Sequence, residues 1–282
     1  MYKTIIVHVD DSPPLAPRLQ AAAWLANAHG AHLVGSAATG LSWPAYVMLA
    51  GSLRIAPDED FDVLRRKARA GLRDFAERAR RLGVESLEER LAEDEHRAAL
   101  LLDSRYADLV VLGQDGGQEA GQVAAVRGLP QYLLLHGPRP VLVVPPNYAG
   151  APIADNVLVG WDGSVQAIRA ITAALPILAR ARAVRLALIN PDQEAGLHGD
   201  EPGADMAHYL VRHGARVEVV AERTRSPAGE ALLGMARAAG AGLLVAGAFG
   251  HSRYREIMLG GVTRVLLERA DAGAAGPLRA GR

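Results

Sequence analysis

The sequence VHVDDS at residues 7–12 is matched later in the chain by VGWDGS at residues 159–164. In both stretches an apolar run ends in aspartate, and a serine follows two positions later. A second pair repeats in the same order, ADLVVLGQDG at residues 107–116 and AGLLVAGAFG at residues 241–250. Two matched landmarks in one order predict a duplicated domain, because their period is much longer than that of a solenoid repeat.

Short runs rich in Val, Ile and Leu alternate in each copy with longer segments of helical period. This pattern predicts a parallel sheet with helices on both faces, so we expect two tandem doubly wound, Rossmann-like α/β domains. The expected strands are 3–9, 31–36, 84–90, 108–113 and 140–145 in the first copy and 155–161, 184–190, 215–222 and 242–247 in the second. The expected helices are 13–28, 59–82, 94–105 and 128–136, then 164–180, 204–213, 226–239 and 260–270.

The prolines and glycines set the expected boundaries. Segment 40–58 contains two prolines and a glycine between its ends, and we expect a long loop there. The sequence RPVLVVP at residues 139–145 gives the first copy a fifth strand, whereas nothing comparable follows residue 270. We therefore expect domains at 1–148 and 153–270, a flexible tail at 271–282, and a second sheet that lacks its fifth strand.

Composition excludes several classes of function. Lys plus Arg and Asp plus Glu both number 31, so no net charge attracts nucleic acid or an anionic membrane. The absence of cysteine excludes disulfides and thiolate chemistry, and no histidine cluster predicts a metal site. No signal peptide and no apolar stretch of the roughly 18 residues that span a bilayer is found, so a cytoplasmic protein is expected.

The most informative stretch is GAFGHSRYREIMLGGVT at residues 247–263, which leaves an expected strand and enters the last expected helix. Gly247 and Gly250 allow the backbone to turn sharply and to approach a ligand. Gly260 and Gly261 begin the helix, where free N–H groups and the helix dipole favour an anion such as phosphate. These features predict a phosphate-binding loop.

Asp162 belongs to the same sheet edge, because ligands of doubly wound sheets bind beyond the carboxyl ends of the strands. Its carboxylate can accept hydrogen bonds from an adenine amino group or from ribose hydroxyls, and Thr263 can add a hydroxyl donor. The alternative is that Asp162, like Asp10, only helps to cap the helix that follows. His251 with its neighbouring arginines is either a phosphate-facing cluster or a solvated loop, and the sequence leaves both open.

The spacing G-x2-G-x9-G, followed by a small residue and Val-Thr, resembles the universal stress protein family over nearly the whole chain, as two tandem domains. The resemblance implies an adenine nucleotide α-hydrolase-like fold that binds ATP or another adenine nucleotide, with Mg²⁺ as a candidate companion ion. In nucleotide-binding members the loop holds the phosphates and ribose, the aspartate contacts adenine, and the second and fourth strands wall the base. With His251 added as a candidate phosphate contact, the implied site residues are Asp162, Leu188, Ala246, Gly247, Gly250, His251, Gly260, Gly261, Val262 and Thr263.

The chain departs from the family pattern in both copies. The family usually has Ser or Thr at the position of Gly261, and the missing hydroxyl costs about 1 kcal/mol if that bond is made. In the first copy Val126 replaces the third glycine, and Asp115 and Glu119 would repel a triphosphate. We therefore expect the first domain to keep the fold without binding the nucleotide.

No nucleophile–base pair and no Walker-type loop is found, so no catalytic residue is assigned and an enzyme is not the expectation. The main hypothesis is a nucleotide-responsive stress protein whose occupancy alters its shape or its unidentified protein partners. One alternative is a structural or interaction protein without nucleotide, and another is a slow ATP hydrolase that uses Asp162 or His251. The apolar edge strand Val141–Val144 must be covered by the second domain or by a second copy in a homodimer.

Overall fold

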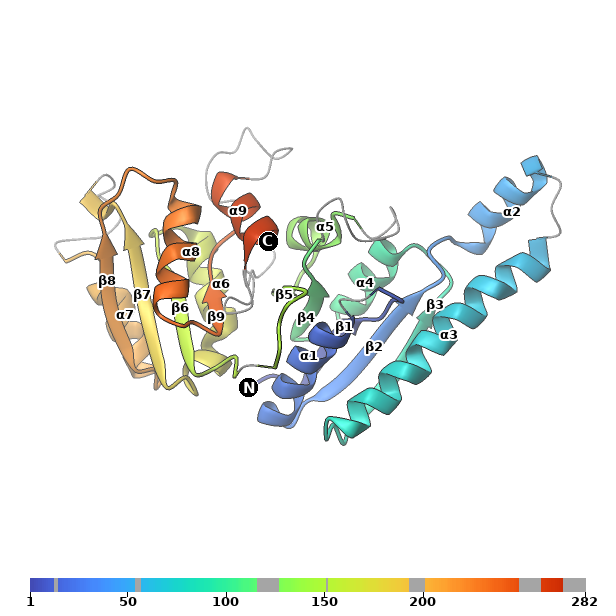
Figure 1. Cartoon of the computed structure of the whole chain (residues 1–282), viewed down its shortest axis with the longest axis horizontal. Helices are drawn as coiled ribbons and strands as arrows, with labels where there is room; N and C mark the ends of the chain where they lie inside the picture. The colour runs from blue at the N-terminus through green and yellow to red at the C-terminus, as the bar shows by residue number, and fades with distance from the viewer. Residues whose placement is uncertain are drawn as a thin grey trace.

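The computed structural model describes residues 1–12, 15–53, 57–115, 127–150, 152–192, 201–248 and 260–270. Two α/β domains follow each other along the chain, each built around one parallel sheet (Figure 1). The predicted doubly wound architecture is confirmed, and within these residues the second sheet has four strands where the first has five. The expected tail at 271–282 lies outside the described residues.

The first domain has the strand order β3-β2-β1-β4-β5, with every neighbouring pair parallel. Because β1 is central and its two neighbours are reached in opposite directions, the sheet reverses at β1, as a doubly wound fold requires. Its elements are β1 (Thr4–His8), α1 (Leu15–His29), β2 (His32–Ala38), α2 (Trp43–Leu53), α3 (Pro57–Arg81), β3 (Leu87–Ala92), α4 (His96–Ser104), β4 (Leu109–Gly113), α5 (Leu129–His136) and β5 (Val141–Val144).

The second domain repeats this topology with the order β8-β7-β6-β9. The strand β6 takes the central place of β1, and β9 takes the place of β4. Its elements are β6 (Asn156–Gly160), α6 (Val165–Leu178), β7 (Ala183–Ile189), α7 (Ala204–Arg212), β8 (Val217–Glu222), α8 (Ala228–Ala238), β9 (Leu243–Val245) and α9 (Gly261–Arg269). Among the described helices of both domains, none is long and apolar enough to cross a membrane.

The loop expected at 40–58 is wrong, because most of that segment is helical. Pro44 and Pro57 lie in the first turns of α2 and α3, where a proline removes no intrahelical hydrogen bond. Trp43 and Tyr46 of α2 pack against the buried ring of Phe61 on α3, with ring centroids 5.0 and 5.4 Å apart. These aromatic contacts join α2 to α3 as a helical hairpin.

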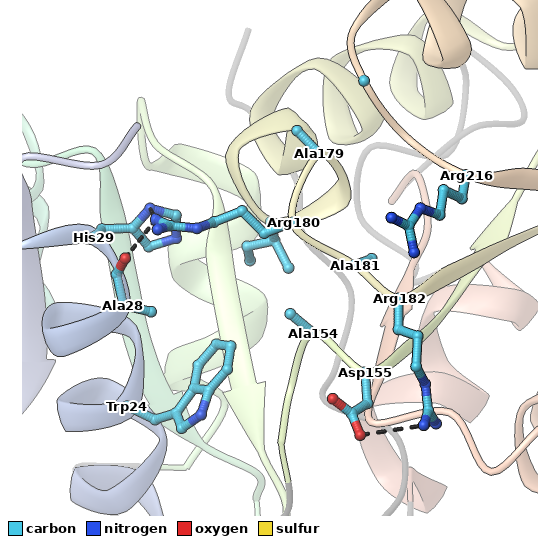
Figure 2. Close-up of a pocket in the computed structure, with 12 residues that line it drawn as sticks. Trp24, Ala28, His29, Ala154, Asp155, Ala179, Arg180, Ala181, Arg182 and Arg216 are labelled. Atoms are coloured by element: carbon cyan, nitrogen blue, oxygen red, sulfur yellow. Dashed lines mark hydrogen bonds and ion pairs between the residues drawn. The ribbon is translucent and has the colours of Figure 1, made fainter.

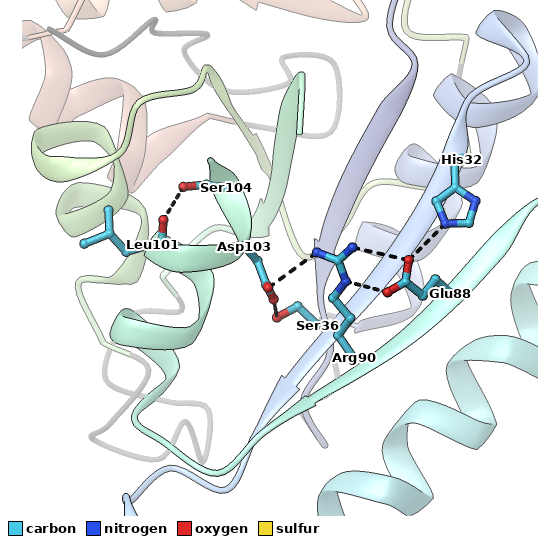
Figure 3. Close-up of polar contacts among 7 residues, drawn as sticks. All are labelled: His32, Ser36, Glu88, Arg90, Leu101, Asp103 and Ser104. Carbon is cyan, nitrogen blue, oxygen red and sulfur yellow. Dashed lines mark hydrogen bonds and ion pairs between the residues drawn. The ribbon is translucent and has the colours of Figure 1, made fainter. Parts of the chain in front are cut away.

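The strand expected at 84–90 begins three residues later, at Leu87. Gly83 ends α3 with φ +82°, and the N–H of Val84 still donates to the carbonyl of Ala79 in the last helical turn. The edge strand β3 is then held by charged groups: Arg90 binds Glu88 at 2.6 Å and lies 3.6 Å from Asp103 of α4 (Figure 3). A charged edge of this kind discourages pairing with another chain.

The core continues from one domain into the other. Leu142 and Val144 of β5 belong to an apolar cluster that also contains Ile153 and Val157 of the second domain. On the opposite face, Val143 clusters with second-domain residues that include Leu267 of α9. All four β5 side chains are buried, so this chain itself covers the side chains of its apolar edge strand.

Candidate functional site

Asp162 lies in the turn between β6 and α6, at the carboxyl edge of the second sheet. Gly163 has φ +74°, which brings the backbone N–H of Ser164 to 2.9 Å from Asp162 Oδ1. Ser164 is the residue that caps α6, since its Oγ accepts the N–H of Ala167 at 3.1 Å. Asp162 thus fixes the turn with one oxygen and is half-buried, while Oδ2 has no partner among the described residues.

The matching aspartate of the first domain, Asp10, is buried and paired with a cation of its own chain. Its Oδ1 accepts hydrogen bonds from the Ser12 hydroxyl and from the Arg18 guanidinium, both at 2.6 Å, and His8 Nδ1 lies 3.6 Å from Oδ2. Burial by itself would raise the pKa of Asp10, but the Arg18 charge beside it, helped by the Ser12 bond, holds that pKa well below its usual value. Asp10 is therefore an ionised carboxylate that is buried from a ligand and whose charge Arg18 neutralises.

A pair of histidines extends this polar cluster. His8 Nε2 and His96 Nδ1 are 3.1 Å apart, and the two rings meet edge to face. Burial lowers the pKa of His8 to about 3, so its imidazole is neutral at physiological pH. The cluster thus joins β1 and α1 to the start of α4 at the edge of the first sheet where a ligand would bind.

The second domain lacks both side chains that occupy Asp10. On the alignment of the two matched motifs, Gly160 stands where the first domain has His8, and Ala170 stands where it has Arg18. Ala170 is fully buried, and a Cβ added to Gly160 would meet a methyl group of Leu232 at 3.2 Å. The polar cluster is therefore replaced by apolar packing, and no cation among the described residues pairs with the Asp162 carboxylate.

No described residue covers the N-terminus of α9, the helix that follows the glycine loop. Gly260 is the N-cap of α9, makes no side-chain hydrogen bond to the helix, and is exposed together with Gly261. A Cβ added at either glycine would meet no described atom within 4 Å. As far as the described residues go, the first N–H groups of α9 and its dipole are left for an anion.

The corresponding helix of the first domain, α5, already has a carboxylate at its N-terminus. Asp115 Oδ2 accepts the N–H of Gly128, the N-cap of α5, at 3.0 Å. Burial raises the pKa of Asp115, against the effects of this hydrogen bond and of Arg97 and Arg127. Asp115, which we expected to repel a triphosphate, therefore lies where a phosphate would bind. Glu119 lies outside the described residues.

Gly247 has a structural reason to be glycine that the sequence did not show. A Cβ at this position would lie 2.7 Å from the backbone nitrogen of Ala167 and 3.0 Å from Cβ of Gln166. The close approach is thus to α6 rather than to a ligand, and it holds the end of β9 against the turn that carries Asp162. Gly250 and His251 lie outside the described residues.

The remaining predicted site residues occupy different faces of the second sheet. Leu188 is fully buried in the cluster that contains Leu210 of α7, whereas Ala246 belongs to the cluster under α8 and α9. Thr263 is only 3% exposed and Val262 is half-buried in the first turn of α9. The structure thus brings Ala246 to the α9 side of the sheet and places Leu188 on the other side.

Sequence reasoning missed Asn190, which follows β7 at the same carboxyl edge. Its amide donates to the carbonyl of Thr224 at 2.9 Å and accepts the Thr224 N–H at 2.8 Å, which ties the ends of β7 and β8 together. Asn190 has φ +49°, a conformation that asparagine tolerates better than most residues. The sequence signal that could have indicated this residue is its position, since it is an asparagine directly after a strand of apolar residues.

Comparison with known proteins agrees with the fold and with the duplication of the domain. The model of the universal stress protein family matches residues 1–145 and 154–272, so the chain belongs to the universal stress protein family and contains two copies of its domain. No curated protein sequence gave a significant match.

Two crystal structures share this tandem fold. A universal stress protein from Archaeoglobus fulgidus DSM 4304 is 16% identical, covers 98% of this chain and 96% of its own, and superposes with a TM-score of 0.71. A putative universal stress protein from Pseudomonas aeruginosa UCBPP-PA14 is also 16% identical, covers 99% and 93%, and gives a TM-score of 0.62. At these identities the likeness shows the common fold.

Proposed function

We propose that the second domain binds ATP or another adenine nucleotide at the carboxyl edge of its sheet, and that the first domain does not. The observation that carries this proposal is the contrast between the two matched aspartates. Asp10 is buried and neutralised by Arg18, whereas Asp162 is half-buried and has no ion pair among the described residues. A half-buried carboxylate that is not paired with a cation of its own chain can accept a hydrogen bond from a ligand.

The chemistry of the second site fits a nucleotide at both ends. Asp162 Oδ2 can accept a hydrogen bond from an adenine amino group or from ribose hydroxyls, and the N-terminus of α9 at Gly260 and Gly261 can hold the phosphates. The loop spacing shared with nucleotide-binding members of the family supports the same assignment. Any Mg²⁺ would arrive with the phosphates, because no group of three or more His, Asp or Glu in the described part of the chain is arranged to bind a metal.

This assignment makes the protein a nucleotide-responsive module rather than an enzyme with an identified catalytic group. The apolar core that runs from β5 into the second domain offers a route by which occupancy near α9 can alter the contact between the domains. A cytoplasmic location, a homodimer and protein partners remain predictions from the sequence.

A matched pair of variants tests the proposal. Asp162→Asn keeps an oxygen for the Ser164 N–H but loses the charged acceptor, and a lost bond to a charged group corresponds to about 10- to 100-fold weaker ATP binding. Asp10→Asn combined with Arg18→Leu makes the matching change in the first domain without leaving a buried charge, and should leave the affinity unchanged. Calorimetric titration of both variants with ATP, with circular dichroism as a check of folding, measures this. Absence of ATP binding by the wild type, or equal affinities for wild type and Asp162→Asn, contradicts the proposal.

A further inference from the structure

A cavity of about 500 Å³ lies between the two domains, away from the proposed nucleotide site (Figure 2). One wall is the C-terminal end of α1, with Trp24 and His29, and the other is formed by residues that come just before β6, β7 and β8. It therefore opens at the amino edge of the second sheet, whereas Asp162 lies at the carboxyl edge. Cavities of this volume at domain boundaries are typical of small-molecule sites.

The cavity is lined by more cations than its own anions can neutralise. Arg180, Arg182 and Arg216 contribute three guanidinium groups, and Asp155 is the one carboxylate among the lining residues. The Arg182–Asp155 pair is long, at 3.8 Å, and both side chains are more than half exposed, so it contributes little stability. The side chain of Arg216 is exposed and makes no hydrogen bond or ion pair with any described residue.

Arg180 has a different role, because it crosses from the second domain to the first. Its guanidinium donates to the carbonyl oxygen of Ala28 and lies 3.4 Å from His29 Nδ1. Burial, reinforced by the charges of Arg180 and of the N-terminal amine, lowers the pKa of His29 to about 4. The neutral imidazole thus supports Arg180, and the positive charge on this side of the cavity is not offset.

Trp24 gives the cavity an apolar wall opposite the arginines. Its half-buried indole projects into the cavity, where it faces Ala154 of the second domain (Figure 2). An aromatic ring next to several guanidinium groups suits a ligand with an apolar or ring portion at one end and an anionic group at the other.

We propose that this interdomain cavity binds a small organic phosphate, whose phosphate is held by Arg216 and Arg182 and whose organic part lies against Trp24. Guanidinium groups match the geometry of phosphate oxygens and can bind them through two parallel hydrogen bonds. A ligand held in this way touches both domains and stabilises their relative placement in addition to the Arg180 contact. This site is independent of the proposed nucleotide site, since the two lie at opposite edges of the second sheet.

Titration of the full chain with phenyl phosphate, followed by calorimetry and by tryptophan fluorescence, tests the proposal. Arg216→Gln removes a guanidinium group that has no partner in the described structure, so folding should be unaffected and affinity should fall about tenfold or more. The matched control is Arg225→Gln, an exposed arginine just beyond β8 at the opposite edge of the same sheet. It makes the same change in charge and should bind phenyl phosphate as the wild type does.

Two further variants distinguish binding in this cavity from binding at the proposed nucleotide site. Trp24→Phe should abolish the fluorescence change while calorimetry still detects binding, because the signal comes from the indole that lines the cavity. Asp162→Asn should bind phenyl phosphate normally, which distinguishes failure here from failure of the nucleotide assignment. No binding by the wild type, equal losses in Arg216→Gln and Arg225→Gln, or loss in Asp162→Asn would each overturn the proposal.

Discussion

Replacing Arg18 with leucine would test the buried cluster that distinguishes the first domain from the second. The side chains of Arg18 and Asp10 are 3% and 8% exposed and are 2.6 Å apart, so the variant leaves a carboxylate buried without its counter-charge. Removing one partner of such a pair costs about 3–5 kcal/mol in the free energy of unfolding. We expect a loss of that size for Arg18→Leu at pH 7.

Urea unfolding followed by circular dichroism measures this loss. The control is Arg78→Leu, which breaks an exposed pair with Asp74 at 2.8 Å and should cost about 0.5 kcal/mol or less. Combining Arg18→Leu with Asp10→Asn leaves no buried charge, so the double variant should regain much of the lost stability. If Arg18→Leu costs no more than Arg78→Leu, the reasoning about the buried pair is refuted.

The pH dependence of unfolding provides a second check on the same pair. The pKa of Asp10 is lower in the folded protein than in the unfolded chain, so the pair stabilises fully above the ordinary aspartate pKa of about 4. This contribution is lost as the pH falls below that value, because the unfolded chain then binds more protons. The difference between wild type and Arg18→Leu should therefore shrink between pH 6 and pH 3, and a constant difference would contradict the assignment.

Three further predictions concern the glycines and the edge strand. Gly261→Ser should tighten ATP binding several-fold in calorimetry, by about 1 kcal/mol, and weaker binding by a folded variant would show that the glycine is needed for backbone shape. Gly260→Val should weaken ATP binding and lower the unfolding midpoint only slightly, through the poorer N-cap. Gly247→Val should lower the midpoint much more, because only its Cβ would meet a backbone atom at 2.7 Å; the reverse pattern would contradict this. Val143→Pro removes an N–H that points away from β4, because N–H groups of β4 and of the residue after it bond to the carbonyls of Pro140 and Val144. It should therefore leave the midpoint nearly unchanged but weaken a homodimer paired through β5, which size-exclusion chromatography with light scattering measures; a monomeric wild type would contradict that role.

The repeated strand patterns were sufficient to predict the fold, because parallel strands buried on both faces read as continuous apolar runs. The error at 40–58 arose from treating Pro44 and Pro57 as breaks, although a proline in the first helical turn is favourable. The contacts of Trp43 and Tyr46 with Phe61 that stabilise this hairpin depend on packing that local sequence signals do not describe.

The candidate site was only partly predictable, because it too depends on packing between elements that local sequence signals do not describe. The position of Asp162 follows from the strand that precedes it. The pairing of Asp10 with Arg18 does not, because Arg18 lies within α1 and contacts Asp10 only when that helix packs on the sheet. For Gly247 the sequence motif predicted a close approach to a ligand, whereas the structure shows a close approach to the backbone of α6. The interdomain cavity left no sequence signal, because its arginines are separated and meet Trp24 only in the folded chain.

The most direct test of the central claim is the number of adenine nucleotides bound per chain. Native mass spectrometry of the full protein with ATP should show one nucleotide per chain for the wild type and for the double variant Asp10→Asn, Arg18→Leu, and a much smaller bound fraction for Asp162→Asn at the same concentration. Two nucleotides per chain would show that Asp10 and Asp115 do not close the first site. No nucleotide bound to the wild type would contradict the assignment of the second.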